Sequence, residues 1–314
     1  MVLFTSTIGQ MAFLLILIAL GFILVRLKLV PASEAGLLSK LENYIFIPAS
    51  ALTTFMTNFT VSRLGEAGGF FICGAVMILI TAPLAVCIAR LCSKDIYTRH
   101  IYTYGLSFSN FGFMGYAVVS ALFPDVYMGY LIFVFSFWIL IYTWGVPYLL
   151  MPNSTEKKGI VSGLKKLINP MFIAMLVGMI FGLTGLSVPS FIGSAVSSLG
   201  NCMSPIAMLL TGMTVAEIDL KKTFKNVSIY VVSIIRLVAL PLAGIAILLI
   251  VPLSYELALC IVCALAMPLG LNTIVVPAAY GKDTSVAAGM ALISHLLSCI
   301  TIPLIFLLFD FVMK

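Results

Sequence analysis

Two stretches of this sequence place amide and hydroxyl side chains beside residues that interrupt helices. The first reads SFSNFGFMG over 107–115, and the second reads MPLGLNT over 267–273 and is followed by Pro277. Proline removes a helix hydrogen bond and glycine loosens the backbone, so both stretches are predicted to contain unwound backbone. Helix ends at such breaks present free backbone amides, which suit an anionic ligand. The candidate binding residues are Ser109, Asn110, Gly112, Pro268, Gly270, Asn272 and Thr273.

The alternative is that these small and amide residues only let helices pack closely. Two ionisable residues, Arg236 and His295, also lie inside apolar runs, where a charge costs about 2.5–3.5 kcal/mol and usually faces a cavity or a partner. We expect Arg236 to raise the potential felt by an anionic ligand, to pin a moving domain, or to bind backbone carbonyls at a helix break. His295 is either a hydrogen-bonded packing residue or a proton-handling group.

The remaining reactive residue types do not form a recognisable site. Cys260 and Cys263 have the spacing of a redox or metal pair, but no second pair completes a site, so we expect two small apolar residues. His295 has no carboxylate or cysteine at catalytic spacing. The sequence therefore predicts that the protein is not an enzyme and that it binds neither a metal ion nor a cofactor. Glu42 lies near the end of its apolar run, where we expect it to be hydrated and dispensable for ion coupling.

The composition places these residues in a membrane protein. Of the 314 residues, 62% are hydrophobic and only 9% are charged, and the mean hydropathy is +1.20. A soluble domain usually carries about 25% charged residues to cover its surface. This composition excludes a cytosolic enzyme, a nucleic-acid-binding protein and a secreted domain held together by disulfides.

Ten apolar runs are long enough to cross a membrane, since a spanning helix needs roughly 20 mostly apolar residues. Basic residues follow the first run instead of preceding it, so we expect a retained anchor and not a cleavable signal peptide. The ten runs are 8–25, 37–57, 69–91, 98–123, 126–149, 169–186, 190–214, 227–251, 255–280 and 284–309.

The basic residues predict the orientation. Of the 17 lysines and arginines, only Arg63 and Lys314 lie on one side, and Arg236 lies within a run. By the positive-inside rule the other side is cytoplasmic, which puts both termini of this multi-pass protein outside the cell membrane. The residues on the cytoplasmic side are Arg26, Lys28, Lys40, Arg90, Lys94, Arg99, Lys157, Lys158, Lys165, Lys166, Lys221, Lys222, Lys225 and Lys282.

An internal repeat is visible in the prolines. Four prolines of the first half recur 156–158 residues later, and Gly112 recurs as Gly270. Each half then holds five runs, and because five is odd the two halves have opposite orientations. Inverted repeats of this kind are typical of secondary transporters, whose binding sites lie near the midplane at discontinuous helices. The proline pairs are Pro31 and Pro189, Pro48 and Pro205, Pro83 and Pro241, and Pro147 and Pro303.

Four fragments resemble the auxin efflux carrier superfamily. Residues 110–115 are similar to that family's fourth-span motif, and 46–49, 236–241 and the Met-Pro pair at 267–268 are similar to motifs of its second, eighth and ninth spans. The resemblance covers essentially the whole chain. It is closest to the short microbial members, because only 151–168 stand where plant carriers have a long loop.

The resemblance implies an all-α membrane protein with ten transmembrane helices, built as two inverted five-helix repeats with crossing broken helices 4 and 9 and related to the bile-acid sodium symporters. A scaffold of 1–66 and 157–220 would often dimerise. A transport domain of 67–156 and 221–314 would move like an elevator. The resemblance also places a functional asparagine at Asn110 and implies an organic-anion substrate.

The sequence therefore predicts a secondary transporter for a small organic anion, such as a carboxylate or dicarboxylate. Its expected partners are the substrate and membrane lipid, and it is not expected to bind nucleic acid. The second crossover reads Pro268-Leu-Gly-Leu-Asn272 instead of the Pro-Gln-Gly pattern of plant carriers, so auxin specificity does not transfer. A sodium-coupled symporter of the bile-acid type and a membrane sensor are the alternatives. Coupling to protons, to sodium or to nothing stays open.

Overall fold

The computed structural model describes residues 2–151, 159–216, 226–279 and 282–313. Within these ranges the chain is helical apart from short connections, and an isolated antiparallel β-bridge joins Ser109 to Leu269. Six of the basic residues used to predict orientation lie outside the described residues, namely Lys157, Lys158, Lys221, Lys222, Lys225 and Lys314.

The helical elements follow one another along the chain with few long connections. In the first half they are α1 (Val2–Arg26), η1 (Ala32–Glu34), α2 (Ala35–Leu41), η2 (Glu42–Phe46), α3 (Ile47–Asn58), α4 (Val61–Cys92), α5 (Ile96–Ser107), η3 (Phe111–Gly115), α6 (Tyr116–Leu122), α7 (Pro124–Leu140) and η4 (Ile141–Leu150). In the second half they are α8 (Ile160–Lys165), α9 (Pro170–Thr184), α10 (Ser190–Asn201), α11 (Met203–Ala216), α13 (Val227–Ile234), η5 (Ile235–Ala239), α14 (Leu240–Leu248), α15 (Tyr255–Ala266), α16 (Asn272–Ala279) and α17 (Ser285–Met313).

Six stretches of helix in the described ranges are long and apolar enough to cross a membrane. They coincide with the first, third, fifth, seventh, eighth and tenth apolar runs of the sequence. The other four runs form shorter or interrupted helices, of which α5 to α6 and α15 to α16 contain the expected breaks. The chain is thus an all-helical, multi-pass membrane protein, whereas the count of ten spans and the inverted repeat stay predictions.

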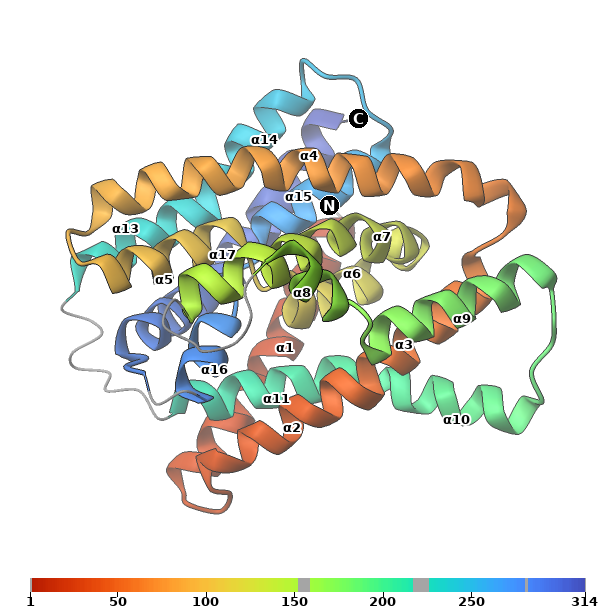
Figure 1. The fold of residues 1–314 in the computed structure, drawn as a ribbon, viewed down its shortest axis with the longest axis horizontal. Coiled ribbons are helices and arrows are strands. Elements are labelled where there is room, and N and C mark those ends of the chain that lie inside the picture. The colour runs from red at the N-terminus through yellow and green to blue at the C-terminus, as the bar shows by residue number, and fades with distance from the viewer. Residues whose placement is uncertain (1, 152–158, 217–225, 280–281, 314) are drawn as a thin grey trace.

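The helices form two groups that lie against each other (Figure 1). Helices α2, α3, α9, α10 and α11 lie in the lower part and lower right of the view, and the long helix α4 crosses the upper part below α14. Helix α1 packs against α11, and there Gly21 and Gly212 each face the backbone of the other helix, so no side chain fits between them. The lower group corresponds to the predicted scaffold. The division into a fixed and a moving domain stays a prediction.

Two helices are widened where an ionisable residue lies inside the membrane region. The π-helical turn Glu42–Phe46 precedes Pro48, and the π-helical turn Ile235–Ala239 precedes Pro241. Proline supplies no N–H to the ladder, and single π-helical turns are frequent at functional sites. The sequence thus loosens the helix beside both Glu42 and Arg236.

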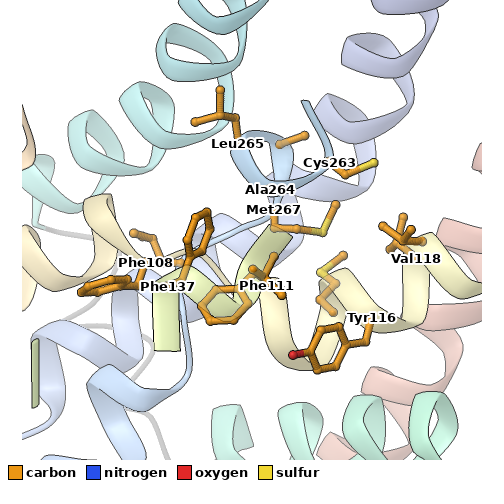
Figure 2. Close-up of a cluster of buried hydrophobic side chains, with 14 of the residues drawn as sticks. Phe108, Phe111, Tyr116, Val118, Phe137, Cys263, Ala264, Leu265 and Met267 are labelled. Carbon is orange, nitrogen blue, oxygen red and sulfur yellow. The ribbon is translucent and has the colours of Figure 1, made fainter. Parts of the chain in front are cut away.

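The apolar core surrounds the two broken helices. Figure 2 shows Phe108, Phe111 and Phe137 gathered beside Met267. The rings of Phe111 and Phe137 meet edge to face, with centroids 5.2 Å apart. All four of these side chains are buried, so the unwound segments are enclosed by packed aromatic groups and not by lipid.

Candidate functional site

The two predicted breaks exist, and they touch each other. Helix α5 ends at Ser107 and the helix resumes at Phe111, while α15 ends at Ala266 and α16 begins at Asn272. Between these ends, the N–H of Asn110 donates to the carbonyl of Pro268 at 2.7 Å, beside the bridge between Ser109 and Leu269. The unwound backbone of each segment thus satisfies part of the other, as non-helical backbone at membrane depth requires.

Two adjacent residues of α17 hold both broken segments. The hydroxyl of Ser294 accepts a hydrogen bond from the N–H of Leu269 at 3.2 Å. The next residue, His295, has its Nε2 3.0 Å from the side-chain nitrogen of Asn110 and its Nδ1 2.7 Å from the carbonyl of Ala291. Helix α17 therefore holds the first segment at the side chain of Asn110 and the second segment at the backbone N–H of Leu269.

These contacts determine how the Asn110 amide points. The Ala291 carbonyl can only accept, so Nδ1 of His295 must carry the proton and donate to it. In the neutral ring Nε2 is then an acceptor, and Asn110 must donate to it with one of its two amide hydrogens. His295 is a hydrogen-bonded packing residue in this structure, and the second amide hydrogen of Asn110 is not used by that contact.

The two half-helices after the breaks begin in different surroundings. The first amides of a helix have no acceptor inside it, and here those of residues 111–113 belong to a stretch that lines a pocket. At the start of α16, by contrast, the N–H groups of Thr273 and Ile274 donate to the carbonyls of Gly270 and Leu271 at 3.2 and 2.9 Å. At the second break, therefore, two of the first amides of α16 are already hydrogen-bonded to the residues that precede it.

A narrow pocket opens where the two segments cross. Its volume is about 20 Å³, which is room for about one water molecule, so it must widen to hold an organic acid. Five predicted binding residues line it, namely Ser109, Asn110, Gly112, Gly270 and Asn272. The walls also include Asn43, Tyr104, Phe108, Phe113 and Trp138.

Two larger cavities lie on opposite sides of this pocket. The inner cavity, of about 340 Å³, lies on the side predicted to be cytoplasmic and shares Asn43, Phe113, Trp138 and Asn272 with the narrow pocket. The outer cavity, of about 220 Å³, shares none of the residues that line the narrow pocket, among those described. It is lined by Ser50, Thr53, Thr54, Thr57, Asn58, Ser120, Pro124, Tyr127, Ser197, Gly200 and Asn201.

Arg236 is buried behind the crossing and binds backbone carbonyls of both broken helices. Its Nη1 donates to Leu106 at 3.0 Å, its Nη2 to Ala264 at 2.6 Å and its Nε to Met267 at 3.2 Å. Helix C-termini carry partial negative charge, so a guanidinium is well placed between two of them. It does not line the narrow pocket. These contacts agree with the third expectation for Arg236, that it binds backbone carbonyls at a helix break.

Two other predicted residues turn away from the pocket. The hydroxyl of Thr273 donates to the carbonyl of Gly270 at 2.8 Å, and Thr273 is buried. Pro268 contributes only its carbonyl, which accepts from Asn110. Ser109 reaches the pocket, but its hydroxyl donates to the carbonyl of Ala264 at 2.8 Å. Asn272 lines the pocket while donating to the hydroxyl of Tyr104 at 3.2 Å.

Glu42 is fully buried, contrary to the expectation that it is hydrated. The turn η2 packs against α9, α10 and α11. The backbone amide of Ala207 faces the carboxyl, but neither carboxyl oxygen has a partner with hydrogen-bond geometry among the described residues. The sequence gives the distance of Glu42 from the end of its run but not the helices that pack over it.

Several site residues were not predicted from the sequence. Tyr104 and Trp138 line the pocket, Asn43 lines both the pocket and the inner cavity, and Ser294 holds Leu269. Nothing in the sequence around these aromatic residues distinguishes a pocket wall from a core residue. Asn43 was the one available signal, as an amide inside an apolar run.

The profile of a family described as membrane transport protein matches residues 6–306 of the chain. The match spans both broken segments, the pocket and the two cavities. No curated protein matches the chain.

Proposed function

Because the chain belongs to the membrane transport protein family, that of the auxin efflux carriers, we propose that it transports a small organic anion by alternating access. The observation that carries this proposal is the Asn110 amide at the crossing of the two broken helices. Its orientation is fixed by His295, and one amide hydrogen remains for a ligand. An amide can donate to a carboxylate without adding a charge that would hinder movement across the membrane.

The chemistry around Asn110 favours an anion over a cation. The half-helix that begins at Phe111 starts among the residues that line the pocket, and helix N-termini of this kind bind carboxylates. No acidic side chain lines the narrow pocket among the described residues. Aromatic walls at Phe108, Phe113 and Trp138 suit the apolar part of a small acid.

The cavities support an inward-facing conformation of an elevator-like cycle. The pocket adjoins the inner cavity and is separate from the outer one. In the proposed cycle the group that contains both breaks slides along the scaffold until the pocket adjoins the outer cavity instead. Arg236 acts in this cycle as a positioning residue that keeps both broken helices together while they move.

We further propose that the scaffold helices form a homodimer in the cell membrane, with both termini outside. A sodium-coupled symporter of the bile-acid type is the runner-up mechanism within transport. A membrane sensor without transport is the alternative outside it.

Transport by purified protein in liposomes tests the proposal. Uptake and exchange of a panel of radiolabelled mono- and dicarboxylates would be compared with those of protein-free liposomes and of an amine and a neutral sugar. We expect saturable transport of at least one acid and of neither control solute. Tight binding of an acid without any exchange would support the sensor, and transport of only the amine or the sugar would contradict the anion site.

A further inference from the structure

We propose that Glu42 binds and releases the proton that couples this protein to a pH gradient. The inference rests on the proposed transport function and adds the coupling ion, which the sequence leaves open. It reverses the sequence-based expectation that Glu42 is dispensable for coupling. Three observations support the assignment: the burial of Glu42, the lack of a partner with good hydrogen-bond geometry for its carboxyl oxygens in the described part of the chain, and neighbouring residues that line two cavities.

Burial without partners determines the charge of Glu42 in this conformation. Its side chain has no exposed surface, and both carboxyl oxygens are without a hydrogen-bond partner in the described part of the chain. An ionised carboxylate is strongly disfavoured in an apolar interior unless it is paired, and it takes up a proton instead. Arg236 is as deeply buried, but three carbonyls accept from it and stabilise its charge. Glu42 has no such set of donors, so its carboxyl is neutral here.

The helices around Glu42 offer it no basic partner. Helices α3, α9, α10 and α11 contain no Asp, Glu, Lys, Arg or His. Helix α2 contributes Lys40, and η2 itself contributes Tyr44, but both are exposed, as is Cys202 between α10 and α11. Tyr127 on α7 interacts electrostatically with Glu42, and its hydroxyl is neutral, so it supplies no compensating charge. A proton is therefore the simplest cation that can neutralise this carboxyl.

Residues next to Glu42 line both cavities. The next residue, Asn43, lines the narrow pocket and the inner cavity. Tyr127 lines the outer cavity, and its hydroxyl is 3.3 Å from that of Ser50 on the same wall. Because Tyr127 belongs to the predicted transport domain and Glu42 to the predicted scaffold, movement between the domains changes which cavity water reaches the carboxyl from.

The chemical step is a single proton transfer. Release breaks the O–H bond of the carboxyl, leaves a carboxylate and passes the proton to water in the cavity that has opened. Uptake from the other cavity reverses these changes and restores the neutral group. The carboxylate is stable only while water solvates it, so the domains can close over Glu42 only after it has taken up a proton. This requirement links proton movement to the transport cycle.

The test compares two kinds of transport in liposomes with the acid that the wild-type protein transports best. Equal-pH exchange needs no net proton movement, whereas accumulation driven by a pH gradient does. With a gradient of about one pH unit, one coupled proton supports about tenfold accumulation. We expect Glu42→Gln, an isosteric mimic of the neutral carboxyl, to lose this accumulation while equal-pH exchange persists. Glu66→Gln, at an exposed glutamate of α4, is the matched control and should accumulate the acid as the wild type does.

Accumulation by Glu42→Gln at the wild-type level would overturn the proposal. So would accumulation that follows a sodium gradient and ignores the pH gradient, because Glu42 would then serve a different ion. If Glu42→Gln is recovered unfolded, Glu42→Asp replaces it, with coupling retained as the expected result and coupling lost as the contrary one.

A second measurement does not depend on transport. The infrared absorption of the wild-type protein at neutral pH should contain the band of a neutral carboxyl. The same band should be absent from Glu42→Gln and present in Glu66→Gln. Its absence from the wild-type protein would overturn the assignment even if organic acids are transported. Its presence in a protein that transports no acid would instead mean that the proposed function fails while the protonation of Glu42 stands.

Discussion

The two broken segments use their polar groups in different ways. In the first, Asn110 keeps an amide hydrogen beyond its bond to His295, and the half-helix after it begins in the pocket wall. In the second, the hydroxyl and the N–H of Thr273 both turn back to Gly270, and Asn272 donates to Tyr104. Two segments that correspond in the predicted repeat have thus diverged. The first is suited to recognise a ligand, and the second is suited to support the first.

Removal of the group that joins the two segments should have the largest effect. Arg236→Gln removes the guanidinium donors from the carbonyls of Leu106, Ala264 and Met267, of which only Ala264 keeps a side-chain donor among the described residues, the hydroxyl of Ser109. Each carbonyl left unsatisfied in the interior costs about 1–3 kcal/mol. We expect a low yield of folded protein and a marked fall in the unfolding temperature of the purified protein in detergent.

Arg90→Gln, at an exposed arginine of α4, is the control for Arg236→Gln and should unfold like the wild type. A normal yield of Arg236→Gln with a selective loss of anion affinity would instead show that Arg236 acts on the ligand. That result would remove the reason for treating it as a structural residue.

The next largest effect concerns the close approach of the two backbones. A Cβ at Gly270 would lie 2.9 Å from the carbonyl oxygen of Phe108 and 3.1 Å from that of Ser109. At Gly112, its counterpart in the predicted repeat, a Cβ would make ordinary contact with Trp138 at 3.5 Å. We expect Gly270→Ala to destabilise the protein by about 1–3 kcal/mol, as overpacking does, and Gly112→Ala to change its stability little. Equal unfolding temperatures for the two variants would argue against the paired geometry.

The smallest effects are expected at the polar residues of the second segment. Asn272→Ala should weaken binding of the transported acid about 2- to 10-fold, the range for a neutral hydrogen bond. Thr273→Val should leave affinity unchanged, because its hydroxyl is buried against Gly270. Titration calorimetry on both variants measures these effects. A larger loss in Thr273→Val than in Asn272→Ala would reverse the roles assigned within this segment.

The breaks themselves could be predicted because proline, glycine and asparagine act on their own stretch of backbone. The helix interruptions at 108–110 and 267–271 follow from such local signals. The partners of these segments could not be predicted, since Asn110 meets His295 across 185 residues and Arg236 meets Leu106 across 130. Nor could the burial of Glu42, which depends on three helices that lie far along the chain. A sequence pattern locates a polar residue along its helix, whereas its satisfaction depends on tertiary packing.

The same reasoning explains why the function of Arg236 stayed undecided at the level of sequence. An arginine inside an apolar run indicates a cavity, a partner or a carbonyl cluster equally well. The three hydrogen bonds from Arg236 to backbone carbonyls in the structure identify the last of these. The orientation of the Asn110 amide is a finer detail still, because it follows from the tautomer of His295 and not from either residue alone.

The difference between Asn110 and Asn272 is the most direct measure of the central claim, that the ligand binds at the first break. The organic acid that the wild-type protein binds best would be titrated into purified Asn110→Ala and Asn272→Ala proteins to measure its affinity for each. The unfolding temperature of each variant would show that it is folded. Loss of a donor to a charged oxygen corresponds to about 1.5–3 kcal/mol, so we predict about a 10- to 150-fold loss of affinity in Asn110→Ala, well beyond that in Asn272→Ala. Unchanged affinity in folded Asn110→Ala would contradict the account and point to a site on the scaffold side, at α3 and α11.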